Sequence, residues 1–277
     1  MHEVFNFDPE VLFEDADVLI LQKPPGVVVN RADTIAVPTI QDWLDVRFKG
    51  LDWPADWEQL VPADFLPEYG TPQEIFASRS GIAHRLDKDT SGVFMCAKHP
   101  GSLLALLKQF RERTITKTYR TLVHGHFSQL EGEVTAPIGR SSTNRKRFAV
   151  VPDGRTAHTF YKVEKSFAKL DLARVSTSVF EQLQQRSDLY QGFTLVTCWP
   201  KTGRTHQIRV HMAHLQHPLV GDVHYVGKKR AKLDPLWCPR QFLHAASIQF
   251  VHPRTGEQLS IEAPLTSDLQ TVLSYLE

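Results

Sequence analysis

The sequence has few cysteines and no long hydrophobic run. Three cysteines, Cys96, Cys198 and Cys238, are spread over its 277 residues. An odd number at wide spacing argues against a disulfide framework and a cysteine-based zinc site, and favours a reducing compartment. No apolar run reaches the roughly 18 residues that a membrane-spanning helix needs, and the first residues lack the basic-then-apolar pattern of a secretory signal peptide. We therefore expect a cytoplasmic protein without a membrane segment.

Low-complexity tracts and internal repeats are also missing, and the remaining composition is that of a globular protein. Hydrophobic residues make up 42% and charged residues 23%, which is ordinary for such a chain. The net charge of +1 is unevenly distributed: residues 1–80 carry 15 acidic and 5 basic side chains, and residues 81–277 carry 16 and 27. A basic body with an acidic front suits a protein that contacts phosphates on one side. A polarised surface that binds nothing fits these counts almost as well.

Short extended segments outnumber helical ones. Helices are expected after caps at Thr39, Ser102, Thr205 and Thr266 or Ser267, where apolar residues follow at helical spacing. A hairpin is expected around Glu131-Gly132, and the Gln-rich stretch 170–190 is expected to be a loop or a hairpin tip. Strands joined by hairpins predict an α+β fold with a mixed, mainly antiparallel sheet flanked by helices and loops. The extended segments are expected at 11–13, 18–21, 115–123, 157–163, 193–198 and 242–251.

Residues 49–80 differ in character from their surroundings. They contain four prolines, three Asp, three Glu and two Trp. Linkers rarely carry so many large apolar groups. We expect a lid-like or packing insertion in a single domain that spans residues 1–277, with its core at about 10–265. The acidity of the insertion would repel phosphates, so it should pack away from an anionic partner or mark the rim of its site.

The segment His84–Gly92 reads His-Arg-Leu-Asp-Lys-Asp-Thr-Ser-Gly and is the most informative in the chain. It places the carboxylate of Asp87 between the cations Arg85 and Lys88, which favour its ionised form. An ionised Asp on a tight turn can act as a nucleophile without a separate base. Judged by its charges alone, the segment is more often a solvated surface turn with an ion pair.

Two further segments are dense in polar groups beside core-like sequence. Lys117-Thr118-Tyr119 lies in an expected strand, where Lys117 and Tyr119 project from the same face. Thr202–His211 reads Thr-Gly-Arg-Thr-His-Gln-Ile-Arg-Val-His and enters an expected helix. Basic residues also cluster at Arg145-Lys146-Arg147, which could follow a phosphate backbone.

Together these segments resemble the RluA-type family of pseudouridine synthases, which isomerise uridine to pseudouridine in structured RNA. His84–Gly92 is similar to the family's nucleophile motif, Lys117–Tyr119 to its Lys-x-Tyr motif, and Thr202–His211 to its Thr-Gly-Arg-x-His-Gln-Ile-Arg-Val-His motif. The resemblance runs from about residue 10 to 265, with its motifs in the expected order. The further matches are Asp17–Gly26, Pro218–Asp222 with Tyr225, Leu243–Ala245 and Phe250–Pro253.

The resemblance implies a role for each catalytic residue. Asp87 is implied to be the nucleophile that attacks either the ribose C1′ or the uracil C6, and the sequence does not choose between them. Tyr119 is implied to stack on the target base and to assist proton transfer, and Arg209 to pair with Asp87. Outside this family, a half-buried strand aromatic and a surface ion pair would be the ordinary interpretations of Tyr119 and Arg209.

RNA contacts are predicted around these catalytic residues. Arg85 is implied to help displace the target base from the RNA stack. Aromatic faces and guanidinium planes are the usual tools for holding splayed RNA bases. The residues predicted to bind RNA are Arg85, Lys117, Arg204, His206, Arg145, Lys146 and Arg147.

The reaction needs no cofactor and no metal, because it breaks a C–N bond and makes a C–C bond with the same atoms, without redox change or consumption of water. Two alternatives compete with this interpretation. His206, His211, His214 and His217 fall within twelve residues and could ligate zinc, but that site would leave Asp87 unexplained. A non-catalytic RNA-binding module would not need Asp87 among cations.

The partner implied by the resemblance is structured RNA, ribosomal or transfer. Many family members carry a small N-terminal RNA-binding domain, whereas here the catalytic pattern begins near residue 10. We therefore expect no separate RNA-binding domain, and the catalytic domain itself should select the RNA. No protein partner is implied, and a monomer is expected.

Overall fold

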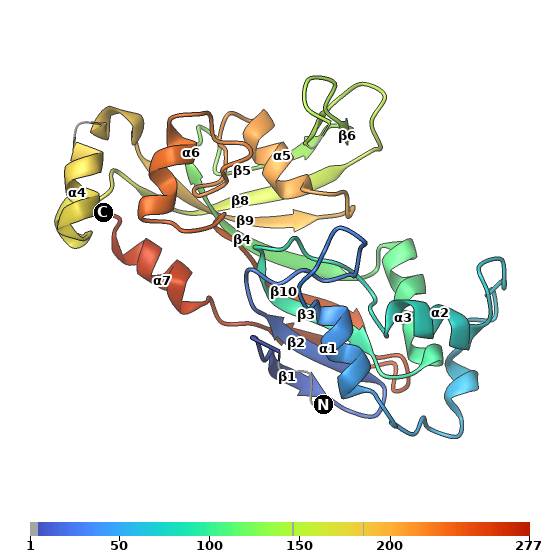
Figure 1. Cartoon of the computed structure of the whole chain (residues 1–277). Helices are drawn as coiled ribbons and strands as arrows, with labels where there is room; N and C mark the ends of the chain where they lie inside the picture. Colours follow the sequence, from blue (N-terminus) through green and yellow to red (C-terminus); the bar gives the residue numbers. More distant parts are fainter. Residues whose placement is uncertain (1–4, 146, 185) are drawn as a thin grey trace. The chain divides into compact units, whose positions relative to one another are not determined.

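The computed structural model describes residues 5–145, 147–184 and 186–277, and the chain divides into two compact units (Figure 1). The first unit takes the chain up to Thr116 together with Ala245–Pro264. The second takes Lys117–His244 together with Leu265–Glu277. That the two units act together as a single catalytic domain stays a prediction.

The first unit is built on a sheet whose strand β3 is buried along its whole length. The β1–β2, β2–β3 and β10–β11 pairings are antiparallel. All seven residues of β3 are buried, which explains why its sequence is a continuous run of small and apolar residues rather than an alternating one. In spatial order the strands are β1 (Glu10–Glu14), β2 (Val18–Lys23), β3 (Ser91–Ala97), β10 (Leu243–Val251) and β11 (Gln258–Glu262).

Helices complete the first unit. In the longest of them, α3 (Pro100–Glu112), Leu103 and Leu106 are fully buried in one core cluster with residues of β2 and β3, as their helical spacing predicts. The first begins with a capping box between Thr39 and Asp42, which satisfies two helix N–H groups reciprocally. The helices are α1 (Ile40–Arg47), η1 (Trp57–Leu60), α2 (Pro72–Arg79) and α3 (Pro100–Glu112).

The segment at 49–80 is packed by its aromatic side chains. The ring centroid of Trp53 lies 5.7 Å from that of Trp57 and 5.6 Å from that of Phe76 in α2. Its acidic residue Asp64 binds Lys108 of α3 at 2.8 Å. These contacts fasten the segment to the first unit, while its predicted behaviour toward RNA stays a prediction.

The second unit contains an antiparallel sheet in the order β4, β9, β8, β5 and a separate β6–β7 hairpin (Figure 1). The sheet buries Leu122, Phe193 and Leu195 in one core cluster with α7. The strands are β4 (Thr116–His124), β5 (Glu131–Thr135), β6 (Ile138–Arg140), β7 (Phe148–Val150), β8 (His158–Phe167) and β9 (Phe193–Pro200). The helices are η2 (Leu172–Arg174), α4 (Thr177–Gln184), η3 (Ser187–Leu189), α5 (Gln207–His214), α6 (Arg230–Leu233), η4 (Asp234–Leu236) and α7 (Ser267–Ser274).

The predicted α+β class with a mainly antiparallel sheet is confirmed, and four local predictions are wrong. The α3 helix is capped by the ring of His99, which accepts from the N–H of Ser102, and not by Ser102 itself. The α5 helix begins after His206 rather than after a Thr205 cap. Glu131 and Gly132 open strand β5 instead of forming a turn. The stretch 170–190 contains α4, whose Leu183 is fully buried.

The cysteine side chains lie in the interior of the protein. All three cysteines are free and buried, and burial raises the pKa of the Cys198 and Cys238 thiols far above the usual range. In the described part of the chain, the helices are too short and too polar to cross a lipid bilayer.

Candidate active site

Asp87 begins a tight turn directly before β3. The N–H of Thr90 donates to the carbonyl oxygen of Asp87 at 3.1 Å. The turn is held by Lys23, a fully buried lysine at the end of β2 whose Nζ donates to three carbonyl oxygens, including those of Lys88 at 2.9 Å and Thr90 at 3.0 Å. Burying an ammonium is costly unless it is hydrogen-bonded. Here its hydrogen bonds fix the backbone of the segment that carries Asp87.

His84 supports the same segment from the core side. Its Nε2 accepts from the N–H of Met95 at 2.9 Å, so this nitrogen carries no proton and the ring is neutral. The ring lies 5.1 Å from that of Phe94 and 5.2 Å from that of Phe110, centroid to centroid. His84 is therefore placed to support the loop.

Gly92 ends the motif at a position where only glycine fits. Its φ is +110°, and a Cβ on it would lie 2.2 Å from the carbonyl oxygen of Ala245 in β10. Asp87 is half-buried and Arg85 is exposed. The first unit thus presents a carboxylate with partial access to solvent on a backbone fixed from both sides.

Tyr119 and Lys117 lie on β4 in the second unit, two residues apart and therefore on one face. Both are half-buried. Tyr119 packs against a core cluster that includes Val196 and Ile208. Burial lowers the pKa of Lys117 to about 8, so its charge changes near neutral pH.

Arg209 is buried in α5 and forms a two-pronged ion pair with Asp222. Its Nε donates to Oδ2 at 2.6 Å and its Nη2 donates to Oδ1 at 2.9 Å. The exposed fractions of the two residues are 3% and 1%. The guanidinium has N–H groups on more than one side, so this pair is compatible with a second acceptor. The predicted pairing of Arg209 with Asp87 stays a prediction.

Tyr225 covers the face of the same guanidinium. The Cζ of Arg209 lies 5.2 Å from the centroid of its ring, within the range of a cation–π contact. The Tyr225 hydroxyl accepts from the N–H of Phe148 at 3.3 Å and lies 3.0 Å from Nδ1 of His206. Arg209, His206 and the β6–β7 hairpin are thereby linked through one side chain.

The start of α5 has an unusual backbone. His206 has a φ of 57°, in the left-handed region, which non-glycine residues rarely adopt and which is found at functional sites. Gln207 organises the preceding loop, because its Oε1 accepts from the hydroxyl of Thr202 at 2.7 Å and from the N–H of Arg204 at 3.0 Å. The Nε of Arg204 donates to the carbonyl oxygen of Thr156 at 3.0 Å. Arg204 is therefore fastened to the protein through that nitrogen.

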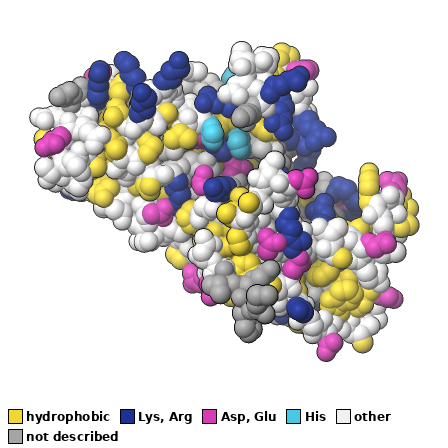
Figure 2. Space-filling model, in the orientation of Figure 1, with side chains coloured by type: hydrophobic (Ala, Val, Ile, Leu, Met, Phe, Trp, Pro, Cys, Tyr) yellow, Lys and Arg dark blue, Asp and Glu magenta, His cyan; other side chains and the backbone are white. Residues whose placement is uncertain are grey.

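The β6–β7 hairpin carries exposed cations. Arg140, Arg145 and Arg147 are exposed, and Figure 2 shows Lys and Arg side chains gathered over this part of the second unit. The Nη1 of Arg140 donates to the carbonyl oxygen of Arg145 at 2.9 Å. Lys146, also predicted to bind RNA, lies outside the described residues.

Three of the four clustered histidines, His206, His211 and His217, contact separate partners within the protein. Both ring nitrogens of His211 are engaged, Nδ1 with the Thr159 hydroxyl at 2.9 Å and Nε2 with the carbonyl oxygen of Ala136 at 3.0 Å. The Nδ1 of His217 lies 2.9 Å from the carbonyl oxygen of His124. These contacts give no support to the zinc alternative.

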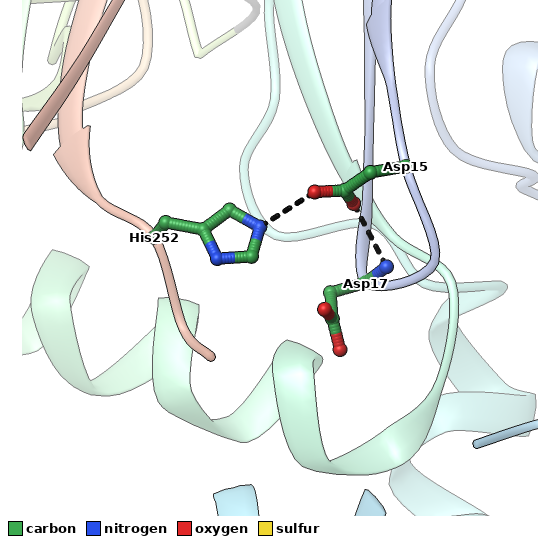
Figure 3. A group of neighbouring side chains, drawn as sticks. All are labelled: Asp15, Asp17 and His252. Atoms are coloured by element: carbon green, nitrogen blue, oxygen red, sulfur yellow. Dashed lines mark hydrogen bonds and ion pairs between the residues drawn. The ribbon is translucent and has the colours of Figure 1, made fainter. Parts of the chain in front are cut away.

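Among the described residues, the side chains of Asp15, Asp17 and His252 are of the types that bind metal ions and lie close enough together to hold one (Figure 3). The Nε2 of His252 lies 2.7 Å from Oδ2 of Asp15. Arg254 donates through Nε to both oxygens of Asp17, at 3.0 and 2.8 Å. Since a guanidinium already neutralises this carboxylate, the group is an ion-pair network that joins the β1–β2 turn to the turn before β11.

Comparison with known proteins identifies the family of this chain. The family model described as RNA pseudouridylate synthase matches residues 17–214. The chain belongs to this family. An uncharacterized RNA pseudouridine synthase, YlyB of Bacillus subtilis, is 34% identical over 97% of this chain and 73% of its own length. The ribosomal large subunit pseudouridine synthase D of Zymomonas mobilis is 34% identical over 96% and 72%.

A solved structure shows the same fold. Human RNA pseudouridylate synthase domain containing 1 superposes with a TM-score of 0.65 at 23% identity, covering 96% of this chain and 87% of that chain. The RluA-type resemblance and the isomerase activity on RNA expected from the sequence are thus confirmed for the chain as a member of the RNA pseudouridylate synthase family.

The predicted site residues are divided between the two units. Arg85 and Asp87 lie in the first, and Lys117, Tyr119, Arg204, His206 and Arg209 lie in the second. Their joint action stays a prediction. Sequence reasoning assigned no role to Asp222, Tyr225 or Lys23, although all three lie in segments that match the family pattern.

Proposed function

We propose that this protein isomerises uridine to pseudouridine in large-subunit ribosomal RNA, with Asp87 as the nucleophile. The observation that carries the proposal is the Asp87 turn, which Lys23 holds by the carbonyl oxygens of Lys88 and Thr90. A carboxylate on a fixed backbone is suited to attack a bound nucleotide, because orientation supplies much of the rate of such a step. The choice of ribosomal RNA is supported by the names of the relatives.

Asp87 would hold the nucleotide covalently while the base turns. The glycosidic C1′–N1 bond breaks and a C1′–C5 bond forms, while C5 loses a proton and N1 gains one, so no redox partner and no water are consumed. Attack on the ribose C1′ and attack on the uracil C6 both satisfy this balance. We propose that no cofactor takes part.

The second unit would supply the groups that bind the flipped base. Leaving the RNA stack costs a few kcal/mol, and stacking on Tyr119 offsets part of this cost. Arg209 would orient Asp87, and Arg85 would help displace the target base from the RNA stack. Lys117, Arg204, His206 and the basic hairpin would contact the RNA chain. We further propose a monomer that acts in the cytoplasm as one catalytic domain.

Pseudouridine mapping tests the proposal. Total RNA from cells with and without the gene is compared at single-nucleotide resolution. We expect one or more pseudouridines of large-subunit ribosomal RNA to disappear without the gene and to return when it is restored on a plasmid. Loss confined to transfer RNA would overturn the RNA class, and an unchanged map would overturn the activity.

A further inference from the structure

The segment from Pro218 to Tyr225 matches the family pattern but has no role in the proposed reaction. It follows α5 and turns sharply at Gly221, whose φ is +74°. A Cβ there would lie 2.1 Å from the carbonyl oxygen of Arg240. The N–H of Gly221 donates to Oδ2 of Asp234 at 3.1 Å. The backbone that leads into Asp222 therefore has little freedom.

Asp222 holds the edge of the Arg209 guanidinium. Its carboxylate receives Nε at 2.6 Å and Nη2 at 2.9 Å, and its Oδ1 also receives the N–H of His224 at 3.1 Å. The carbonyl oxygen of Asp222 receives the N–H groups of Tyr225 and Val226 at 3.0 and 3.1 Å. One residue thus pairs with the arginine and shapes the turn that follows.

Tyr225 holds the face of the same group. The turn places its ring 5.2 Å from the Cζ of Arg209. The ring itself is fixed, because its hydroxyl contacts His206 and the N–H of Phe148. An edge contact and a face contact together leave a planar guanidinium with one orientation.

Arg209 is only 3% exposed, so its contacts with Asp222 and Tyr225, rather than water, set the orientation of its guanidinium. A guanidinium held in place before the substrate arrives does not have to be reorganised during the reaction. Asp222 and Tyr225 are held by other residues of the second unit, so their contacts with Arg209 do not depend on bound RNA.

We infer that Asp222 and Tyr225 are positioning residues for the isomerisation, which act by fixing the guanidinium of Arg209. The inference rests on the proposed function, in which Arg209 orients the nucleophile. It gives the Pro218–Tyr225 segment a task that is distinct from binding RNA.

Steady-state kinetics on large-subunit ribosomal RNA transcribed in vitro test the inference. Asp222→Asn should lower kcat about 100-fold, the cost of misplacing a reacting group, with KM changed less than about threefold because RNA binding is retained. Tyr225→Leu should lower kcat in the same way. Tyr225→Phe keeps a ring against Arg209 but loses the hydroxyl contacts, and it should lower kcat less than Tyr225→Leu does.

A second arginine–aspartate pair provides the control. Arg240 donates to Asp268 through Nε at 2.6 Å and Nη2 at 3.2 Å, in the same unit. Asp268→Asn should lower the melting temperature without the fall in kcat. If Asp222→Asn does not fold, the contrast between Tyr225→Leu and Tyr225→Phe decides.

The outcomes separate the two proposals. An active wild type with full kcat in Asp222→Asn, or with equal kcat in Tyr225→Leu and Tyr225→Phe, overturns the inference alone. A rise in KM without a fall in kcat also overturns it. A wild-type protein that forms no pseudouridine in any RNA overturns the proposed function and the inference with it.

Discussion

The Nζ of Lys23 donates a hydrogen bond of 3.0 Å to the carbonyl oxygen of Thr90. The two residues belong to β2 and to the turn before β3, and the lysine is fully buried. The ammonium therefore ties the core of the first unit to the segment that carries Asp87.

Replacing Lys23 by Met should lower the free energy of unfolding by about 3 kcal/mol, because buried carbonyl oxygens lose a charged donor. Chemical denaturation measures this change. Lys49→Met, at an exposed position, should change the stability by less than about 0.5 kcal/mol. Equal stability of the two variants would show that the Lys23 contacts do not hold the turn.

Gly92→Ala should destabilise the protein by more than about 3 kcal/mol, since backbone strain and a clash with β10 add together. Its Cβ would meet the carbonyl oxygen of Ala245 at 2.2 Å. Gly203→Ala is a suitable control, because no atom beyond its two chain neighbours lies within 4 Å of the added Cβ. Similar melting temperatures for both variants would contradict the close approach of β3 and β10.

Lys117 should make stability depend on pH. Its pKa is lowered from 10.5 to about 8 by burial. Between these values the unfolded chain binds the proton more tightly than the folded protein does, so stability rises with pH across the window, and below pH 8 the cost of the buried ammonium is fully present. The wild type should therefore gain up to about 3 kcal/mol over Lys117→Met from pH 8 to 10.5.

Denaturation curves of the two proteins at several pH values measure this difference. Lys162→Met replaces an exposed lysine of β8 and should show no comparable rise. A constant difference between wild type and Lys117→Met over the same range would mean that Lys117 is not desolvated.

Neutralising Arg145, Lys146 and Arg147 together should weaken RNA binding and reduce its salt dependence. Removing one cation that binds a phosphate lowers the slope of log affinity against log salt concentration by about 1. Titrations at several salt concentrations measure the slope. Lys169→Gln, which removes a cation paired with Glu277 at 3.1 Å, should leave it unchanged, and an unchanged slope in the triple variant would show that the hairpin does not bind the RNA.

Residues that act within a few positions of each other could be found from the sequence. The Asp87 motif, the Lys117–Tyr119 pair and the strands with buried runs all carry local patterns. Partners set by tertiary structure could not be found in this way. Lys23 and Lys88 are 65 residues apart, and the pairing of Arg209 with Asp222 depends on the turn at Gly221.

Local signals also failed where another residue competed. Ser102 has a favoured capping side chain, but its hydroxyl donates to the carbonyl oxygens of Asp17 and His99 instead. The polar composition of 170–190 concealed α4, although Val179 and Leu183 lie four residues apart. The expectation of a loop gave more weight to the Gln and Ser residues of this stretch than to the helical spacing of its apolar residues.

Pseudouridine formation by purified Asp87→Asn tests the central claim most directly. The assay follows pseudouridine in large-subunit ribosomal RNA transcribed in vitro, and Asp89→Asn on the same turn is the matched control. Asp87→Asn should form no detectable pseudouridine while keeping its melting temperature and RNA affinity, and Asp89→Asn should remain active. Turnover by Asp87→Asn at the wild-type rate would contradict the role of Asp87 as nucleophile.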